Sequence, residues 1–142
     1  MEETQALLQA VVRGSEMGKN TLTQLLPAAG APALRAELLR QRRAYRVLNQ
    51  QAHTALAALG CRAKGLGWHA RAVTRLGIAA QLRRDASDCR LARMLIRGGA
   101  LGLSDCRGAL RACPSAAAGA RLLAHRLCCI EQQGAARLRA FL

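Results

Sequence analysis

The stretch RMLIRGGALGLSDC, residues 93–106, contains the pattern that decides the fold. Its apolar residues recur every three or four positions, as they do along one face of an amphipathic α-helix. The same stretch contains Gly98, Gly99 and Gly102, although each glycine costs a helix interior about 1 kcal/mol relative to alanine. Two explanations are open: the glycines permit close packing against another helix, or they mark a local kink.

The composition of the whole chain is typical of an all-α protein. Of its 142 residues, 51% are hydrophobic but only 2% are aromatic, and Leu, Ala and Arg dominate. Leu, Ala and Arg favour helices, whereas a β-sheet draws on β-branched and aromatic residues. A chain of this length and hydrophobic content is expected to form one domain, residues 1–142, with a real core.

Proline and glycine divide the chain into expected helices. Pro27 ends the first helix, Pro32 suits the first position of the second, and Pro114 separates the last two. The expected helices are 3–26, 32–59, a short one at 66–82, 87–112 and 115–141. Short connections make sequential helices antiparallel neighbours. The sequence therefore predicts a four-helix bundle of two αα-hairpins, joined by a crossover that contains the short helix.

Helical spacing places two pairs of glycines on faces that we expect to point inward. Gly14 and Gly18 lie one turn apart on the first helix, and Gly98 and Gly102 lie one turn apart on the 87–112 helix. Small residues with this spacing let helix backbones approach closely. The sequence therefore predicts that these two helices touch at their glycines, with a kink at Gly98 and Gly99 as the alternative.

A buried polar cluster is the second expectation for the interior. Asp105 falls within the apolar stripe of the 87–112 helix, where a bare carboxylate needs a partner or a proton. On the 32–59 helix, Gln41 and Tyr45 lie one turn apart among apolar neighbours. We therefore predict a hydrogen-bonded cluster of Gln41, Tyr45 and Asp105 that fixes the helix register, with a ligand or metal pocket as the less favoured interpretation.

The helices LLRQRRAYRVLNQQAHTALAALG and RMLIRGGALGLSDC, with their inward polar residues, resemble those of small ferritin-like bundles found in bacteria. The resemblance covers nearly the whole chain and implies a ferritin-like four-helix bundle. Di-iron members of this class carry Glu-x-x-His pairs. Here Glu37 is followed three residues later by Arg40, and Glu131 by Gly134. The iron chemistry of the class is therefore not expected, and neither a metal nor another cofactor is predicted.

The sequence contains six cysteines but no sign of a zinc ribbon or a redox dithiol. The cysteines stand at positions 61, 89, 106, 113, 128 and 129, with no CxxC pair. We expect them to be reduced and mostly packed in the interior, although the adjacent Cys128 and Cys129 could bind a soft metal or be oxidised. No phosphate loop or Ser/His/Asp spacing is present, so no catalytic residue is predicted.

The chain is strongly basic, with 22 Lys and Arg against 8 Asp and Glu, a formal charge of +14. Two arginine stripes could neutralise phosphates because guanidinium groups bind them with paired donors. The stripes comprise Arg90, Arg93, Arg97, Arg107 and Arg111 on the 87–112 helix, and Arg35, Arg42, Arg43 and Arg46 on the 32–59 helix. However, arginine occurs on every expected helix, and no exposed aromatic platform or nucleic-acid motif accompanies it.

These patterns favour a non-enzymatic ferritin-like bundle that associates with itself or with a protein partner. The alternative is a basic helical protein that binds nucleic acid or another polyanion electrostatically. No apolar run reaches the roughly 20 residues that cross a bilayer, and no secretory signal opens the chain. We therefore expect a cytoplasmic protein that does not insert into a membrane.

Overall fold

The computed structural model describes residues 1–142, apart from the side chain of Trp68, and is helical almost throughout. Its helices are α1 (Glu2–Leu25), α2 (Pro32–Ala58), α3 (Trp68–Arg84), α4 (Asp88–Ala112) and α5 (Ala118–Leu138). Two short 3₁₀ turns, η1 (Leu26–Ala28) and η2 (Arg139–Phe141), follow α1 and α5. The all-α prediction is confirmed, and every predicted helix boundary lies within three residues of the observed one.

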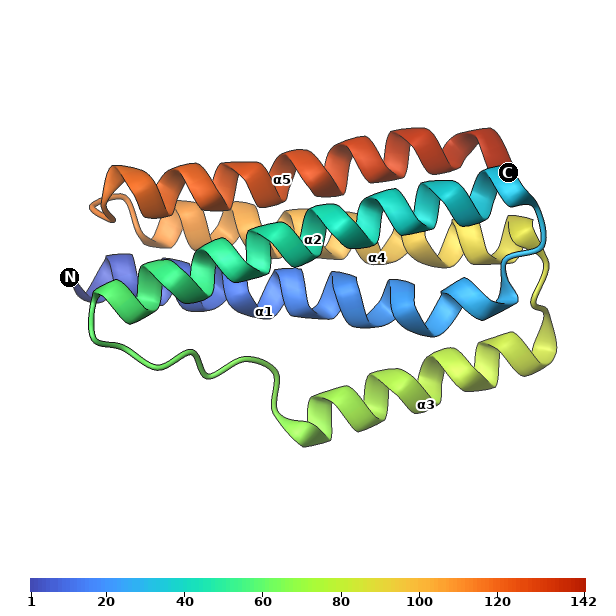
Figure 1. The fold of residues 1–142 in the computed structure, drawn as a ribbon, viewed down its shortest axis with the longest axis horizontal. Helices are drawn as coiled ribbons and strands as arrows, with labels where there is room; N and C mark the ends of the chain where they lie inside the picture. Colours follow the sequence, from blue (N-terminus) through green and yellow to red (C-terminus); the bar gives the residue numbers. More distant parts are fainter.

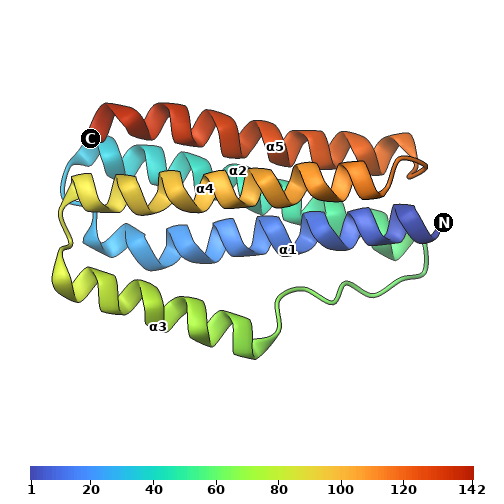
Figure 2. The same ribbon diagram turned by 180° about the vertical axis from the view of Figure 1, so that it is seen from behind.

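Four of the helices pack side by side along their length (Figure 1). The helices α1 and α2 form one antiparallel hairpin, α4 and α5 form another, and α1 and α4 run in opposite directions (Figures 1 and 2). The crossover between the hairpins contains α3, which lies outside the four helices on the side of α1 (Figure 2). This arrangement leaves α3 as a cover over one side of the bundle.

The helix boundaries follow from capping chemistry at the turns. Pro32 occupies the first turn of α2, where its missing N–H breaks no helical hydrogen bond. The Ser87 side chain accepts a hydrogen bond from the backbone N–H of Arg90 at 3.3 Å and so caps α4. The Asp88 carboxylate accepts the backbone N–H groups of Gly30 and Ala31 at 2.8 and 2.9 Å. Asp88 therefore ties the first hairpin to the start of the second.

Leucine forms most of the core of the bundle. The largest side chains that are withdrawn from solvent include Leu7, Leu22, Leu34, Leu38, Leu56 and Leu91. Removing one such side chain from water contributes about 1.5–3 kcal/mol to folding. The hydrophobic effect along the facing stripes of α1, α2, α4 and α5 is therefore the main stabilising force.

The α3 helix is less firmly attached than the other four. Among its described side chains, only Ile78 is buried, whereas Val73 and Leu76 are largely exposed. One polar contact to α1 is a hydrogen bond from Gln24 Nε2 to the carbonyl of Arg75 at 2.7 Å. The α3 helix is therefore the part of the bundle that can move with the smallest loss of buried surface.

The loop before α3 is anchored to α1 by two side chains. Gln9 donates to the carbonyl of Arg62 and accepts the backbone N–H of Lys64, both at 2.9 Å. Glu16 accepts the backbone N–H of Leu66 at 3.1 Å, next to Gly65, whose φ of +59° favours glycine.

Among the described residues, no helix combines the length and the hydropathy required to cross a membrane.

Candidate functional site

A cavity of about 890 Å³, partly open to solvent, runs between α1, α4 and α5, and α3 covers part of it. All five helices contribute to its wall, and most of the exposed lining is apolar. Apolar side chains that line it include Leu7, Val11, Met94, Leu95, Leu127 and Leu138. Its size lies within the roughly 300–1,000 Å³ typical of sites for small molecules.

A buried Tyr–Glu pair lies at the wall of this cavity. Tyr45 of α2 and Glu131 of α5 are each only 6% exposed. A Cβ atom at Gly18 of α1 would come within 2.6 Å of the Tyr45 ring, and one at Gly102 of α4 would come within 2.6 Å of Glu131 Oε1. The two glycines therefore provide the space that the pair occupies.

Burial changes the proton affinity of both members of the pair. Loss of hydration raises the pKa of Glu131 to about 7, and a hydrogen bond from Tyr45 partly opposes this effect. Burial also raises the pKa of the Tyr45 hydroxyl, as does the adjacent Glu131 charge. The Tyr45 hydroxyl therefore stays protonated and donates a hydrogen bond, whereas the Glu131 carboxyl group titrates near neutral pH.

The predicted close approach of α1 and α4 at their glycines is wrong. Gly98 is exposed, and a Cβ atom there would meet nothing within 4 Å. A Cβ atom at Gly14 would instead meet the side chain of Leu127 on α5, at 2.8 Å. The inward glycines make room for side chains of α2 and α5, and α4 remains one continuous helix through Gly98 and Gly99.

The predicted hydrogen-bonded cluster of Gln41, Tyr45 and Asp105 does not form. Gln41 and Tyr45 are buried, but Asp105 is exposed at the edge of the cavity. The buried acid is instead Glu131, which sits at helical spacing from Leu127 and Leu138 on the inner face of α5. That spacing is a sequence signal that could have identified Glu131.

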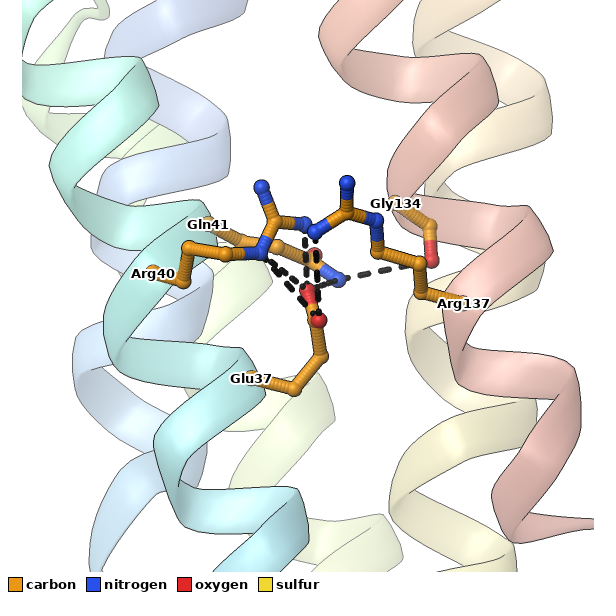
Figure 3. A network of polar contacts seen from close by, with 5 residues as sticks. All are labelled: Glu37, Arg40, Gln41, Gly134 and Arg137. Atoms are coloured by element: carbon orange, nitrogen blue, oxygen red, sulfur yellow. Dashed lines mark hydrogen bonds and ion pairs between the residues drawn. The ribbon is translucent and has the colours of Figure 1, made fainter.

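Gln41 belongs to a different polar network, which joins α2 to α5 (Figure 3). Its Nε2 donates to Glu37 Oε2 at 2.9 Å and to the carbonyl of Gly134 at 3.3 Å. Glu37 also accepts hydrogen bonds from Arg40 and lies 3.9 Å from Arg137 Nη1. Although burial raises the pKa of Glu37, these hydrogen bonds and charges hold it below its usual value. This network clamps the hairpins together beside the cavity.

The arginine stripe of α4 divides into two parts. Arg90, Arg93 and Arg97 line the cavity, whereas Arg107 and Arg111 are exposed outside it. Arg90 is half-buried, and its Nε is the one buried side-chain nitrogen or oxygen without a hydrogen-bond partner among the described residues.

The predicted stripe of α2 lies outside this cavity. Its members Arg35, Arg43 and Arg46 are exposed and Arg42 is half-buried.

The cysteines are all free thiols, as their spacing predicts. Cys106 of α4 donates to the Ala124 carbonyl at 3.1 Å, and its Sγ lies 3.1 Å from Cys128 Sγ of α5. Cys128 is buried but Cys129 is exposed, so the adjacent thiols have different surroundings. Within the described part of the chain, no group of three potential metal ligands occurs.

No family model, curated protein or solved structure matches this chain.

Proposed function

We propose that this chain is a non-enzymatic helical bundle that binds one small, largely apolar molecule in this cavity. The observation that carries the proposal is the cavity of about 890 Å³, with its apolar wall and the buried Tyr45–Glu131 pair. A pocket of this kind gains binding energy from apolar surface, while a few polar groups orient the ligand. The easily displaced α3 offers an entry route without disruption of the four packed helices.

The arrangement of the core supports binding rather than catalysis. The carboxyl group of Glu131 on α5 and the phenol of Tyr45 on α2 face the cavity as a hydrogen-bonded pair, a polar group of the kind that orients a bound ligand. The thiol of Cys106 also lines the cavity, but burial raises its pKa, so little thiolate forms at neutral pH.

Titration calorimetry with decanol tests this function, because decanol is apolar and uncharged. We expect saturable binding with one site per chain. Ala135→Phe, which fills part of the cavity from α5, should abolish it, whereas Ala136→Phe, at the exposed neighbouring position, should leave it unchanged. Circular dichroism melting confirms that each variant is folded. Wild-type protein that binds no decanol, or equal binding by both variants, would contradict the proposal.

A second pair on α1 provides an independent version of the same test. Ala10 lines the cavity, whereas Ala6 is exposed and does not. Ala10→Phe should weaken decanol binding and Ala6→Phe should not. This pair keeps the proposal open to refutation if Ala135→Phe fails to fold.

Electrostatic binding of a polyanion is the second candidate function, which the formal charge of +14 and the exposed Arg107 and Arg111 support. Its test is the binding of unrelated DNA duplexes, which should have similar affinities that fall steeply with salt. Salt-resistant or sequence-selective binding would contradict that account.

Self-association or association with a protein partner, a ferritin-like relationship and a cytoplasmic location remain predictions. Light scattering tests self-association directly. A single monomeric mass at all concentrations would exclude it.

A further inference from the structure

We propose that the ligand is a single-chain amphiphile with an anionic head, and that Arg90, Arg93 and Arg97 hold this head. The inference rests on the proposed binding function and adds the chemical class of the ligand.

The three arginines lie along the part of the cavity wall that the first half of α4 forms. They are spaced three and four residues apart, so they share one face of α4, and all three line the cavity. No ion pair in the described residues involves them. Hydrogen bonds with Ser87 are the main reason that the pKa of Asp85 is lowered, and the charges of Arg90 and Arg93 lower it further. Three guanidinium groups therefore have donors available for a carboxylate, sulfonate or phosphate.

Arg90 provides the most specific evidence for an anion. Its Nε is buried and lacks a partner, which is costly for a charged group. Its Nη2 makes only a long hydrogen bond of 3.4 Å to Gln81 Oε1 of α3. If the Arg90 side chain turns its Nε toward the cavity, an anionic oxygen there would supply the missing acceptor, and the contact to Gln81 would connect the occupied site to α3.

The opposite end of the cavity suits an alkyl chain. Because α1 and α4 run in opposite directions (Figure 1), the start of α4, which contains Arg90, lies toward the end of α1. The last turns of α4, which contain Ala109, lie toward the start of α1. Leu7, Cys106 and Ala109 line the cavity at that far end. A ligand with its head at Arg90 would therefore extend its apolar chain along α1, toward Glu131.

Glu131 makes this binding dependent on pH. Tyr45 of α2 and Cys106 of α4 are the titratable groups that face it. Other charged groups at the cavity wall are Arg13 of α1 and Arg90, Arg93, Arg97 and Asp105 of α4, while the lining residues of α3 are uncharged. An ionised Glu131 repels the anion and loses hydration beside an alkyl chain, so the ligand binds best when Glu131 is protonated.

Titration calorimetry with three ten-carbon probes tests the ligand class: decanesulfonate, decanol and decyltrimethylammonium, each below its micellar concentration. At about pH 6, decanesulfonate should bind at least tenfold more tightly than decanol, and the cation should bind most weakly. Shortening the sulfonate should weaken binding by about fourfold per methylene, the ratio that corresponds to ~0.8 kcal/mol. Because a sulfonate stays ionised, weaker binding at about pH 8.5 would report the ionisation of Glu131.

Substitution of the arginines provides the matched control. The triple substitution Arg90→Gln, Arg93→Gln and Arg97→Gln should remove the preference for sulfonate but retain decanol binding. Arg107→Gln, which removes an exposed arginine of the same helix outside the cavity, should change neither affinity.

The outcomes separate the two proposals. If the wild-type protein binds decanol at least as tightly as the sulfonate, or prefers the cation, the proposal of an anionic ligand is overturned. The proposal that the cavity binds an apolar molecule then still stands. Absence of binding by all three probes overturns both. If anionic vesicles capture the protein but monomeric decanesulfonate does not bind, the arginines bind a membrane surface. This outcome also overturns the inference.

Discussion

The carboxylate of Glu131 on α5 occupies the space that a side chain at Gly102 on α4 would need. An ideal Cβ atom at Gly102 would lie 2.6 Å from Oε1 of Glu131, well inside van der Waals contact. This relationship explains why glycine stands at position 102 of an otherwise regular helix. A second glycine, Gly99, also faces Glu131, with 3.4 Å between its ideal Cβ and Oε2.

Alanine substitution should distinguish Gly102 from Gly98. Gly98→Ala should raise the free energy of unfolding by up to about 1 kcal/mol, because a methyl group there meets open space and alanine favours the helix. Gly102→Ala should raise the free energy of unfolding by less, or lower it, since its methyl group displaces the Glu131 carboxylate. Urea denaturation measures both values. Equal stabilisation by both substitutions would contradict the position of Glu131.

Urea denaturation of variants that also carry Glu131→Ala isolates the contact between Gly102 and Glu131. When Glu131→Ala has removed the carboxylate, Gly102→Ala should stabilise as much as Gly98→Ala does. Such non-additivity is expected of residues in direct contact. Additive effects would mean that Glu131 and Gly102 do not meet.

Glu131 should make the protein less stable as the pH rises. Its pKa is about 7 in the folded protein against an ordinary 4.5, so the folded state holds the proton more tightly. This contribution to stability is complete below about pH 4.5 and is lost as the pH rises through about 7, a change on the order of 3 kcal/mol. Urea denaturation across this range measures the change.

Two variants control for the other titrating groups. Glu131→Gln keeps an acceptor for Tyr45 but cannot ionise, so it should remove this dependence on pH. Glu2→Gln, at an exposed position of α1, should retain the wild-type slope. An unchanged slope in Glu131→Gln would show that another group causes the effect.

Tyr45→Phe should raise the pKa of Glu131 further, because the hydrogen bond from the Tyr45 hydroxyl stabilises the charged carboxylate. The carboxyl ¹³C chemical shift of Glu131, followed through a pH titration, measures this pKa. A pKa that stays the same or falls in Tyr45→Phe would exclude the hydrogen bond.

The thiols should react with iodoacetamide in the order of their exposure. Cys129 is exposed and should be alkylated first, whereas Cys106, Cys113 and Cys128 are buried and should be protected in the folded protein. Burial also raises the pKa of Cys106, which lowers its reactive thiolate fraction. Mass spectrometry of peptides after short labelling gives the order. Rapid alkylation of Cys128, which is buried outside the cavity, would contradict the packing of α4 against α5.

The sequence predicts the helices well because proline, glycine and capping residues act locally. Pro32 and Ser87 mark helix starts by their own chemistry, whatever the rest of the chain does. The periodicity of apolar residues likewise identifies α4 as a long amphipathic helix.

The rotation of α4 was harder to predict, and this explains two errors. The predicted inward stripe contains Gly98 and Asp105, whereas the observed one contains Gly99 and Cys106, one residue further along. Apolar residues surround much of this helix, and Leu101 is 64% exposed, so hydropathy alone does not fix the face. The choice depends on packing against α5, which the local sequence does not encode.

The Tyr45–Glu131 pair could be predicted only in part. Tyr45 lies in a clear apolar stripe of α2, but the identity of its acidic partner depends on which helices are neighbours. The cavity is lined by residues of all five helices, so no local pattern predicts it.

The most direct test of a cavity that binds an anionic amphiphile is the position of bromine in crystals grown with ω-bromodecanoate, located by anomalous scattering. The account predicts one bromine site per chain inside the cavity, on the side of Arg90 where Glu131 lies, with the carboxylate beside Arg90. Bromine found only on the outer surface, such as the shallow groove between α2 and α5 lined by Val47 and Ile130, would contradict it.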